Sequence, residues 1–177
     1  LKSVTGETLT VDDTELTTQT SSVTESTLSG IDYFDIEYGA DTKQSLDYTL
    51  SLNDSSPTLQ ALVDGNWQNV TVTASSDGHT LTGSVGTTTV FTVVVDGDGK
   101  VTLTQYKPLQ HPDATNPDDI VSQSVKLTAT ATDKDNDTAT NNVDLTLNFK
   151  DDGPEVIVDG KATELILDAT VSAEMLA

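Results

Sequence analysis

Apolar and polar residues alternate with a period of two along most of this chain, which is typical of β-strands that bury one face. Threonine fills many of the intervening positions and suits the exposed face of such strands. No stretch shows helical periodicity over more than a turn or two. The apolar positions of the four clearest stretches are Leu46, Tyr48, Leu50 and Leu52; Val70, Val72 and Ala74; Val125, Leu127, Ala129 and Ala131; and Val143, Leu145, Leu147 and Phe149.

A fifth stretch, residues 88–96 (TTVFTVVVD), is almost continuously β-branched and predicts a central strand. The next strand is expected at residues 101–104, and the DGDG sequence of residues 96–99 between them predicts a tight hairpin. Similar turn signals separate the other strands. Many short strands divided by turns predict an all-β fold, a β-sandwich of short, mostly antiparallel strands with long acidic loops.

Two segments carry weaker signals. Thr17 to Ser29 has few apolar residues, and we expect a loop or a weak edge strand there. Lys107 to Asp119 contains three prolines and is expected to form a long ordered loop between strands.

A short pattern near the start recurs near the end. Residues 11–16 read VDDTEL and residues 158–165 read VDGKATEL, so that Asp12 and Asp159 are 147 positions apart. Repetition at a fixed spacing indicates a tandem array. We therefore expect a β-sandwich repeat module over residues 1–153, and a linker with the start of the next repeat, or a closing strand, over residues 154–177.

The chain is strongly acidic, with 29 Asp and Glu against 8 basic residues, all of them lysine, and a formal net charge of −21. Such a charge repels polyanions, so nucleic acid and anionic membrane surfaces are not expected partners. No apolar run approaches the roughly 18 to 20 residues that span a bilayer, and no membrane insertion is expected. The excess carboxylates instead favour divalent cations, above all calcium.

The DKDND sequence of residues 133–137 is the strongest candidate for a calcium site. Asp133, Asp135 and Asp137 would project to one side of an extended loop and surround a hard cation that takes six to eight oxygen ligands. The segment lacks the glycine and distal glutamate of an EF-hand. A solvated polar turn is the alternative.

Two further acidic segments are candidate calcium sites. Asp151 and Asp152 precede Gly153-Pro154, where one module is expected to join the next, and they suit a calcium-clamped linker; a simple charged turn is the alternative. In the proline-braced loop, calcium could be held by three carboxylates, those of Asp113, Asp118 and Asp119.

Zinc and catalysis have little support in the sequence. His111 and His79 have no second histidine nearby and the chain has no cysteine, so both are expected to be surface loop residues rather than zinc ligands. No nucleophile elbow or phosphate-binding loop is present, and we expect no enzyme. A carboxylate pair that cleaves glycosides is the enzymatic alternative. Trp67 and Tyr106 could stack on a sugar, although a lone tryptophan after a turn is more often a packing residue.

With these residues in view, the chain resembles the long tandem-repeat module of the giant calcium-dependent RTX adhesins that bacteria export by type I secretion. The resemblance extends from the YGAD sequence of residues 38–41 to the DDGP sequence of residues 151–154. Asn136 stands where family members often carry glycine. The most specific motifs are VTLTQY at 101–106, HP at 111–112, NPDD at 116–119, LTATATD at 127–133 and DDGP at 151–154.

The resemblance implies a calcium-loaded β-sandwich that is secreted and displayed at the cell surface. Its implied partners are neighbouring repeats of the same chain and a peptide or glycan on a host or microbial surface. One hypothesis is an adhesion module that supports attachment or biofilm formation and binds a ligand at a surface calcium. The alternative is a passive extender whose calcium only stiffens the chain.

Overall fold

The computed structural model describes residues 7–16, 24–28, 33–53, 57–113, 115–116 and 118–153. The expected linker and next repeat at residues 154–177, with the second copy of the repeated pattern, lie outside the described residues. Within the described ranges, no helix is long and apolar enough to span a bilayer.

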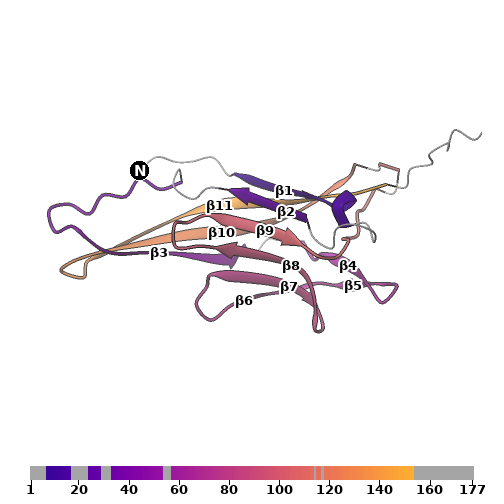
Figure 1. The fold of residues 1–177 in the computed structure, drawn as a ribbon, viewed down its shortest axis with the longest axis horizontal. Helices are drawn as coiled ribbons and strands as arrows, with labels where there is room; N and C mark the ends of the chain where they lie inside the picture. The colour runs from indigo at the N-terminus through magenta and orange to yellow at the C-terminus, as the bar shows by residue number, and fades with distance from the viewer. Residues whose placement is uncertain are drawn as a thin grey trace, which may run out of the picture.

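Two β-sheets form the body of the molecule (Figure 1). Sheet I contains, in spatial order, β1 (Thr8–Asp12), β11 (Thr138–Lys150), β10 (Ile120–Asp133) and β3 (Lys43–Leu52). Sheet II contains β2 (Thr24–Leu28), β9 (Val101–Gln105), β8 (Thr88–Val95), β7 (Thr80–Val85) and β6 (Thr71–Ala74). A small separate hairpin pairs β4 (Gln60–Val63) with β5 (Asn66–Asn69). The prediction of an all-β, sandwich-like fold with mostly antiparallel strands is confirmed.

The alternating apolar residues of both sheets form one core. In β11, the four apolar residues that alternate from Val143 to Phe149 are buried, while the residues between them are more accessible. The rings of Phe91 in β8 and Phe149 in β11 lie 5.1 Å apart between their centroids and join the two sheets. The largest side chains with almost no exposed surface are Phe91, Phe149, Leu9, Leu81, Leu103, Leu109, Leu127, Leu145 and Leu147.

Several local predictions are confirmed. β8 is the central strand of sheet II, and it pairs with β9 through the expected hairpin. The side chain of Asp96 closes that hairpin, since its Oδ1 accepts the backbone N–H of Asp98 at 3.0 Å and that of Lys100 at 2.9 Å. The weak segment before residue 30 supplies β2 at one edge of sheet II.

Two local predictions are wrong. The alternation from Val70 to Ala74 does not belong to one strand, because the Val70 N–H donates to the Leu59 carbonyl at 2.8 Å and β6 starts only at Thr71. Trp67 is not a packing residue: it lies in β5 opposite Leu62 and is 44 % exposed. The β4–β5 hairpin pairs with neither sheet, and Leu62 and Trp67 are exposed on it.

The two ends of sheet I differ in how their strands are connected (Figure 1). At one end β10 and β11 meet in a hairpin turn at residues 133–137. At the other end β1 and β11 run parallel, with Val11 opposite Phe149 and Asp12 opposite Lys150. β1 passes directly into a short 3-10 helix, η1 (Asp13–Leu16). Parallel neighbours end at the same edge of a sheet, so the residues that follow β1 and β11 come together there.

Candidate metal sites

Two groups of three ligand side chains occur among the described residues, each with its ligand atoms within 4.8 Å of one another. Asp41, Asp133 and Asp135 form the first group, which we call the hairpin-tip cluster. Asp13, His111 and Asp151 form the second, which we call the strand-end cluster. The two clusters lie at opposite ends of sheet I.

The hairpin tip is a tight turn. The Asn136 N–H donates to the Asp133 carbonyl at 3.2 Å, and the Asp137 N–H donates to Asp133 Oδ1 at 3.0 Å. Asn136 has φ of 73°, a left-handed conformation that asparagine tolerates better than most residues. The expected extended loop with three carboxylates on one side is therefore wrong in its geometry, and Asp137 is not part of the cluster.

Asp41 replaces Asp137 as the third carboxylate. A register shift in the β10–β3 pairing places Asp133 opposite Lys43, which brings the segment before β3 against the turn. The Gln44 side chain also donates to Asn136 Oδ1 at 3.0 Å and ties the two segments together. A hydrogen bond with the Asp135 carboxyl, desolvation and the nearby negative charges raise the pKa of Asp133. Carboxylates this close repel one another unless a proton or a cation lies between them.

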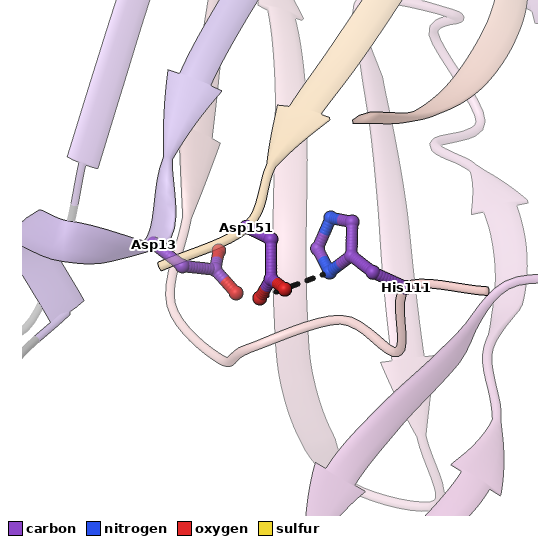
Figure 2. A group of neighbouring side chains, drawn as sticks. All are labelled: Asp13, His111 and Asp151. Atoms are coloured by element: carbon purple, nitrogen blue, oxygen red, sulfur yellow. Dashed lines mark ion pairs between the residues drawn. The ribbon is translucent and has the colours of Figure 1, made fainter. Parts of the chain in front are cut away.

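The strand-end cluster combines three segments (Figure 2). Asp13 is the first residue after β1, and Asp151 is the first residue after β11. His111 comes from the long loop between β9 and β10. In Figure 2 the Asp151 carboxylate lies between the Asp13 carboxylate and the His111 ring, and His111 Nδ1 is 3.5 Å from Asp151 Oδ1.

His111 is not the surface residue expected from the sequence, because only 3 % of its side chain is exposed. Its Nε2 lies 2.9 Å from the Phe149 carbonyl oxygen. A carbonyl can only accept, so Nε2 carries the proton and donates. His111 Nδ1 is buried and has no hydrogen-bond partner. His79, which was also expected to be a surface residue, does lie in an exposed turn, beside Asp47 and Asp77.

Asp13 is the most buried acid of this cluster. Burial raises its pKa to about 6, although a hydrogen bond from Gln105 works in the opposite direction. That bond is short, with Gln105 Nε2 2.6 Å from Asp13 Oδ1, and the same amide donates to the Lys107 carbonyl at 3.0 Å. The contacts hold the Asp13 carboxylate in one orientation.

The remaining predicted ligands lie outside both clusters. Asp113 Oδ1 accepts the N–H and the hydroxyl of Thr115, and these bonds lower the pKa of Asp113. Asp119 Oδ2 accepts the Asp113 N–H at 3.0 Å, and Asp118 Oδ1 lies 2.7 Å from Lys150 Nζ. Asp152 is exposed and belongs to neither cluster. In the described part of the loop, these carboxylates therefore serve to order the backbone and pair with a lysine.

A groove lies along sheet I, and several of the residues that line it are close in sequence to the hairpin-tip cluster. It has a volume of about 450 Å³. Its walls are residues 33–37 on one side and, on the other, the end of β10 and the start of β11 nearest to the turn. Tyr33 and Phe34 give it aromatic surface, while Asp35 and Glu37 give it negative charge.

Residues 8–146 match the family described as "Domain of unknown function (DUF5801)". The chain belongs to this family. The matched range contains all three residues of the hairpin-tip cluster, and it contains Asp13 and His111 but ends before Asp151. No match was found among the curated proteins. Because the family description names no activity, function has to be argued from the sites.

Sequence reasoning missed Asp13, Asp41 and Gln105. Asp13 and Asp41 stand outside the three acidic segments, and Gln105 is the last residue of a strand. Asp13 lies within the pattern repeated near residue 158, and Asp41 and Gln105 lie within the YGAD and VTLTQY motifs, but none of these patterns indicated a metal ligand.

Proposed function

We propose that this chain is a calcium-dependent adhesion module of a large secreted bacterial adhesin of the RTX type, displayed at the cell surface. The module would support attachment or biofilm formation alongside neighbouring repeats, as a binding domain rather than an enzyme. The observation that carries the proposal is the hairpin-tip cluster, in which two segments far apart in sequence bring Asp41, Asp133 and Asp135 together.

Calcium suits this cluster better than other common ions. It is a hard cation that prefers carboxylate, carbonyl and water oxygens, and it tolerates irregular geometry. All three side chains of the cluster are carboxylates, and two of them are exposed, so water can complete the coordination. The net charge of −21 adds a long-range attraction for cations.

The groove beside the cluster is the proposed ligand site. Aromatic side chains such as Phe34 offer a face on which a sugar ring or an apolar peptide side chain can pack. The carboxylates of Asp35 and Glu37 can accept hydrogen bonds from sugar hydroxyls or peptide N–H groups. A calcium ion at the neighbouring turn would fix the position of residues 41 and 133–135 and so the end of the groove.

A peptide and glycan array, probed in millimolar calcium and again in EDTA, tests the proposal. We expect binding that requires calcium and that is lost in Asp135→Asn, which removes one ligand charge from the cluster. Glu37→Gln should weaken the same binding without affecting calcium uptake. Asp98→Asn is the matched control, because it removes an exposed carboxylate from a turn outside both clusters.

The outcomes separate the two roles considered above. Calcium binding at Asp41, Asp133 and Asp135 with no ligand on any array would indicate a passive extender. A ligand that binds equally well in EDTA and to Asp135→Asn would contradict the calcium-dependent mechanism.

A further inference from the structure

We propose that the strand-end cluster is a binding site for a divalent transition-metal ion of the zinc class, with His111 Nδ1 and the carboxylates of Asp13 and Asp151 as its ligands. This site is distinct from the proposed calcium site in position and in chemistry. It does not depend on the adhesive function.

The first argument is the state of His111. Because Nε2 donates to the Phe149 carbonyl, Nδ1 is the ring atom that faces the cluster, and in the neutral tautomer it carries a lone pair that can bind a metal ion. That nitrogen is buried without a hydrogen-bond partner, and it lies 3.5 Å from a carboxylate oxygen of Asp151. A buried nitrogen lone pair beside a carboxylate oxygen is unfavourable unless an electrophile, either a metal ion or a proton, lies between them.

The second argument is the set of contacts behind the ligands. A metal-binding histidine usually donates its other ring N–H to a carbonyl or carboxylate, which fixes the tautomer, and Phe149 plays that part here. A ligating carboxylate is usually held by a hydrogen bond in turn, and the buried Gln105 holds Asp13 in this way. Both ligands are thus oriented by backbone and side-chain partners before any ion binds.

The third argument concerns size and ligand type. Zinc forms bonds of about 2.0–2.2 Å to nitrogen and oxygen, so tetrahedral ligands stand roughly 3.3–3.6 Å apart. The distance of 3.5 Å between His111 Nδ1 and Asp151 Oδ1 falls within that span. Calcium needs six to eight oxygen ligands and has little affinity for imidazole, whereas zinc and its neighbours accept one nitrogen and two carboxylates.

A metal at this position would join three segments that are remote in sequence. Asp13 follows the edge strand β1, His111 belongs to the β9–β10 loop, and Asp151 stands where the chain leaves β11. The ion would fasten the parallel β1–β11 pair at its open end. Since about 30 % of the Asp151 side chain is exposed, solvent and metal can reach the site from that side.

The test is zinc and cobalt binding to the whole chain at neutral pH. We expect calorimetry to show one zinc ion bound per chain. With Co²⁺ as the probe, we expect a visible absorption band of the kind that tetrahedrally coordinated Co²⁺ gives. His111→Gln keeps a donor for the Phe149 carbonyl but removes Nδ1, and Asp151→Asn keeps the shape of a partly exposed side chain. Each should weaken zinc binding at least about tenfold. Calcium should not compete.

The matched control is His79→Gln, because His79 also has two carboxylates nearby but lies in an exposed turn. It should leave zinc affinity unchanged. Circular dichroism confirms that each variant is folded. Absence of one-to-one zinc binding by the folded wild type, which would leave a proton on Nδ1 as the simpler explanation, overturns the proposal. So does zinc binding that survives Asp151→Asn and disappears in His79→Gln.

Discussion

At the scale of single residues, Gly83 shows how tightly a core side chain packs over its neighbouring strand. It lies in β7 against the ring of Phe91, and that ring in turn meets Phe149 across the core. A Cβ added at Gly83 would stand 2.6 Å from Phe91 Cζ, well inside van der Waals contact. The residue is therefore glycine because of space, and its backbone does not need the left-handed conformation.

Gly83→Ala should lower the free energy of unfolding by about 1–3 kcal/mol, because the Phe91 ring can move only by disturbing the core. Urea unfolding in chelator measures this value. Gly97→Ala is the control, since a Cβ there meets no atom within 4 Å. Equal stability of the two variants would contradict the close packing of the Phe91 ring against Gly83.

At the scale of elements, the long β10–β11 pair carries an ion pair in direct register. Lys126 and Asp144 are opposite each other, and Lys126 Nζ lies 3.0 Å from Asp144 Oδ1. Asn53 also donates to Asp144 Oδ1 at 3.1 Å. Both hydrogen bonds lower the pKa of Asp144 below its ordinary value of 3.8, and the bond from Lys126 has the larger effect.

The pH dependence of stability follows from that lowered pKa. An aspartate whose pKa is lower when folded stabilises the fold above pH 3.8, and the contribution is lost as pH falls through the folded pKa. Asp144→Asn should therefore make unfolding free energy fall less steeply below about pH 4. The effect should stay below about 1 kcal/mol and shrink in high salt, because the pair is exposed to solvent.

Urea titrations at a series of pH values from 5 downward, as far as the protein stays folded without urea, check this prediction. Lys126→Gln should remove much of the same dependence, and the double variant should add little to either single change. Additive effects of the two substitutions would show that the pair does not interact.

At the scale of the whole molecule, acidic charge dominates. With 29 acidic residues against 8 lysines, the folded chain concentrates like charge, and carboxylates lie close together in both clusters. A compact state with this charge is weakened by self-repulsion and strengthened by bound cations. Stability should therefore depend on divalent ions as well as on ionic strength.

Calcium should raise the thermal midpoint relative to EDTA. A site that binds only the folded state adds about 2.7 kcal/mol at a hundredfold excess over its Kd, which corresponds to roughly 5–10 °C for a chain of this size. Scanning calorimetry with sodium chloride at matched ionic strength separates binding from screening. Asp135→Asn should reduce the calcium-dependent rise and leave the protein in EDTA unchanged or slightly more stable, because it relieves repulsion. Midpoints that agree within about a degree would contradict calcium binding.

The sequence by itself determined several of the strands, and for the long ones it also determined which face is buried. Alternation is a local property and can be read from residues that are neighbours in the sequence. Such local patterns predicted three features: the buried face of β11 from Val143 to Phe149, the β-branched strand β8 and the turn at residues 96–99. Where the prediction failed, at Val70, a hydrogen bond to Leu59 outside the segment ended the strand. The acidic turn at residues 133–137 was found, but its partner Asp41 was not.

Only the tertiary structure decided which of the 29 acids meet. The strand-end cluster exists because β1 pairs in parallel with β11, whose contacting residues Asp12 and Lys150 are 138 positions apart. No local pattern encodes such a pairing, since it depends on how the apolar faces of whole strands fill one core. The same packing buries the side chain of His111, which the sequence had placed on the surface, and brings its Nδ1 close to the carboxylates of Asp13 and Asp151.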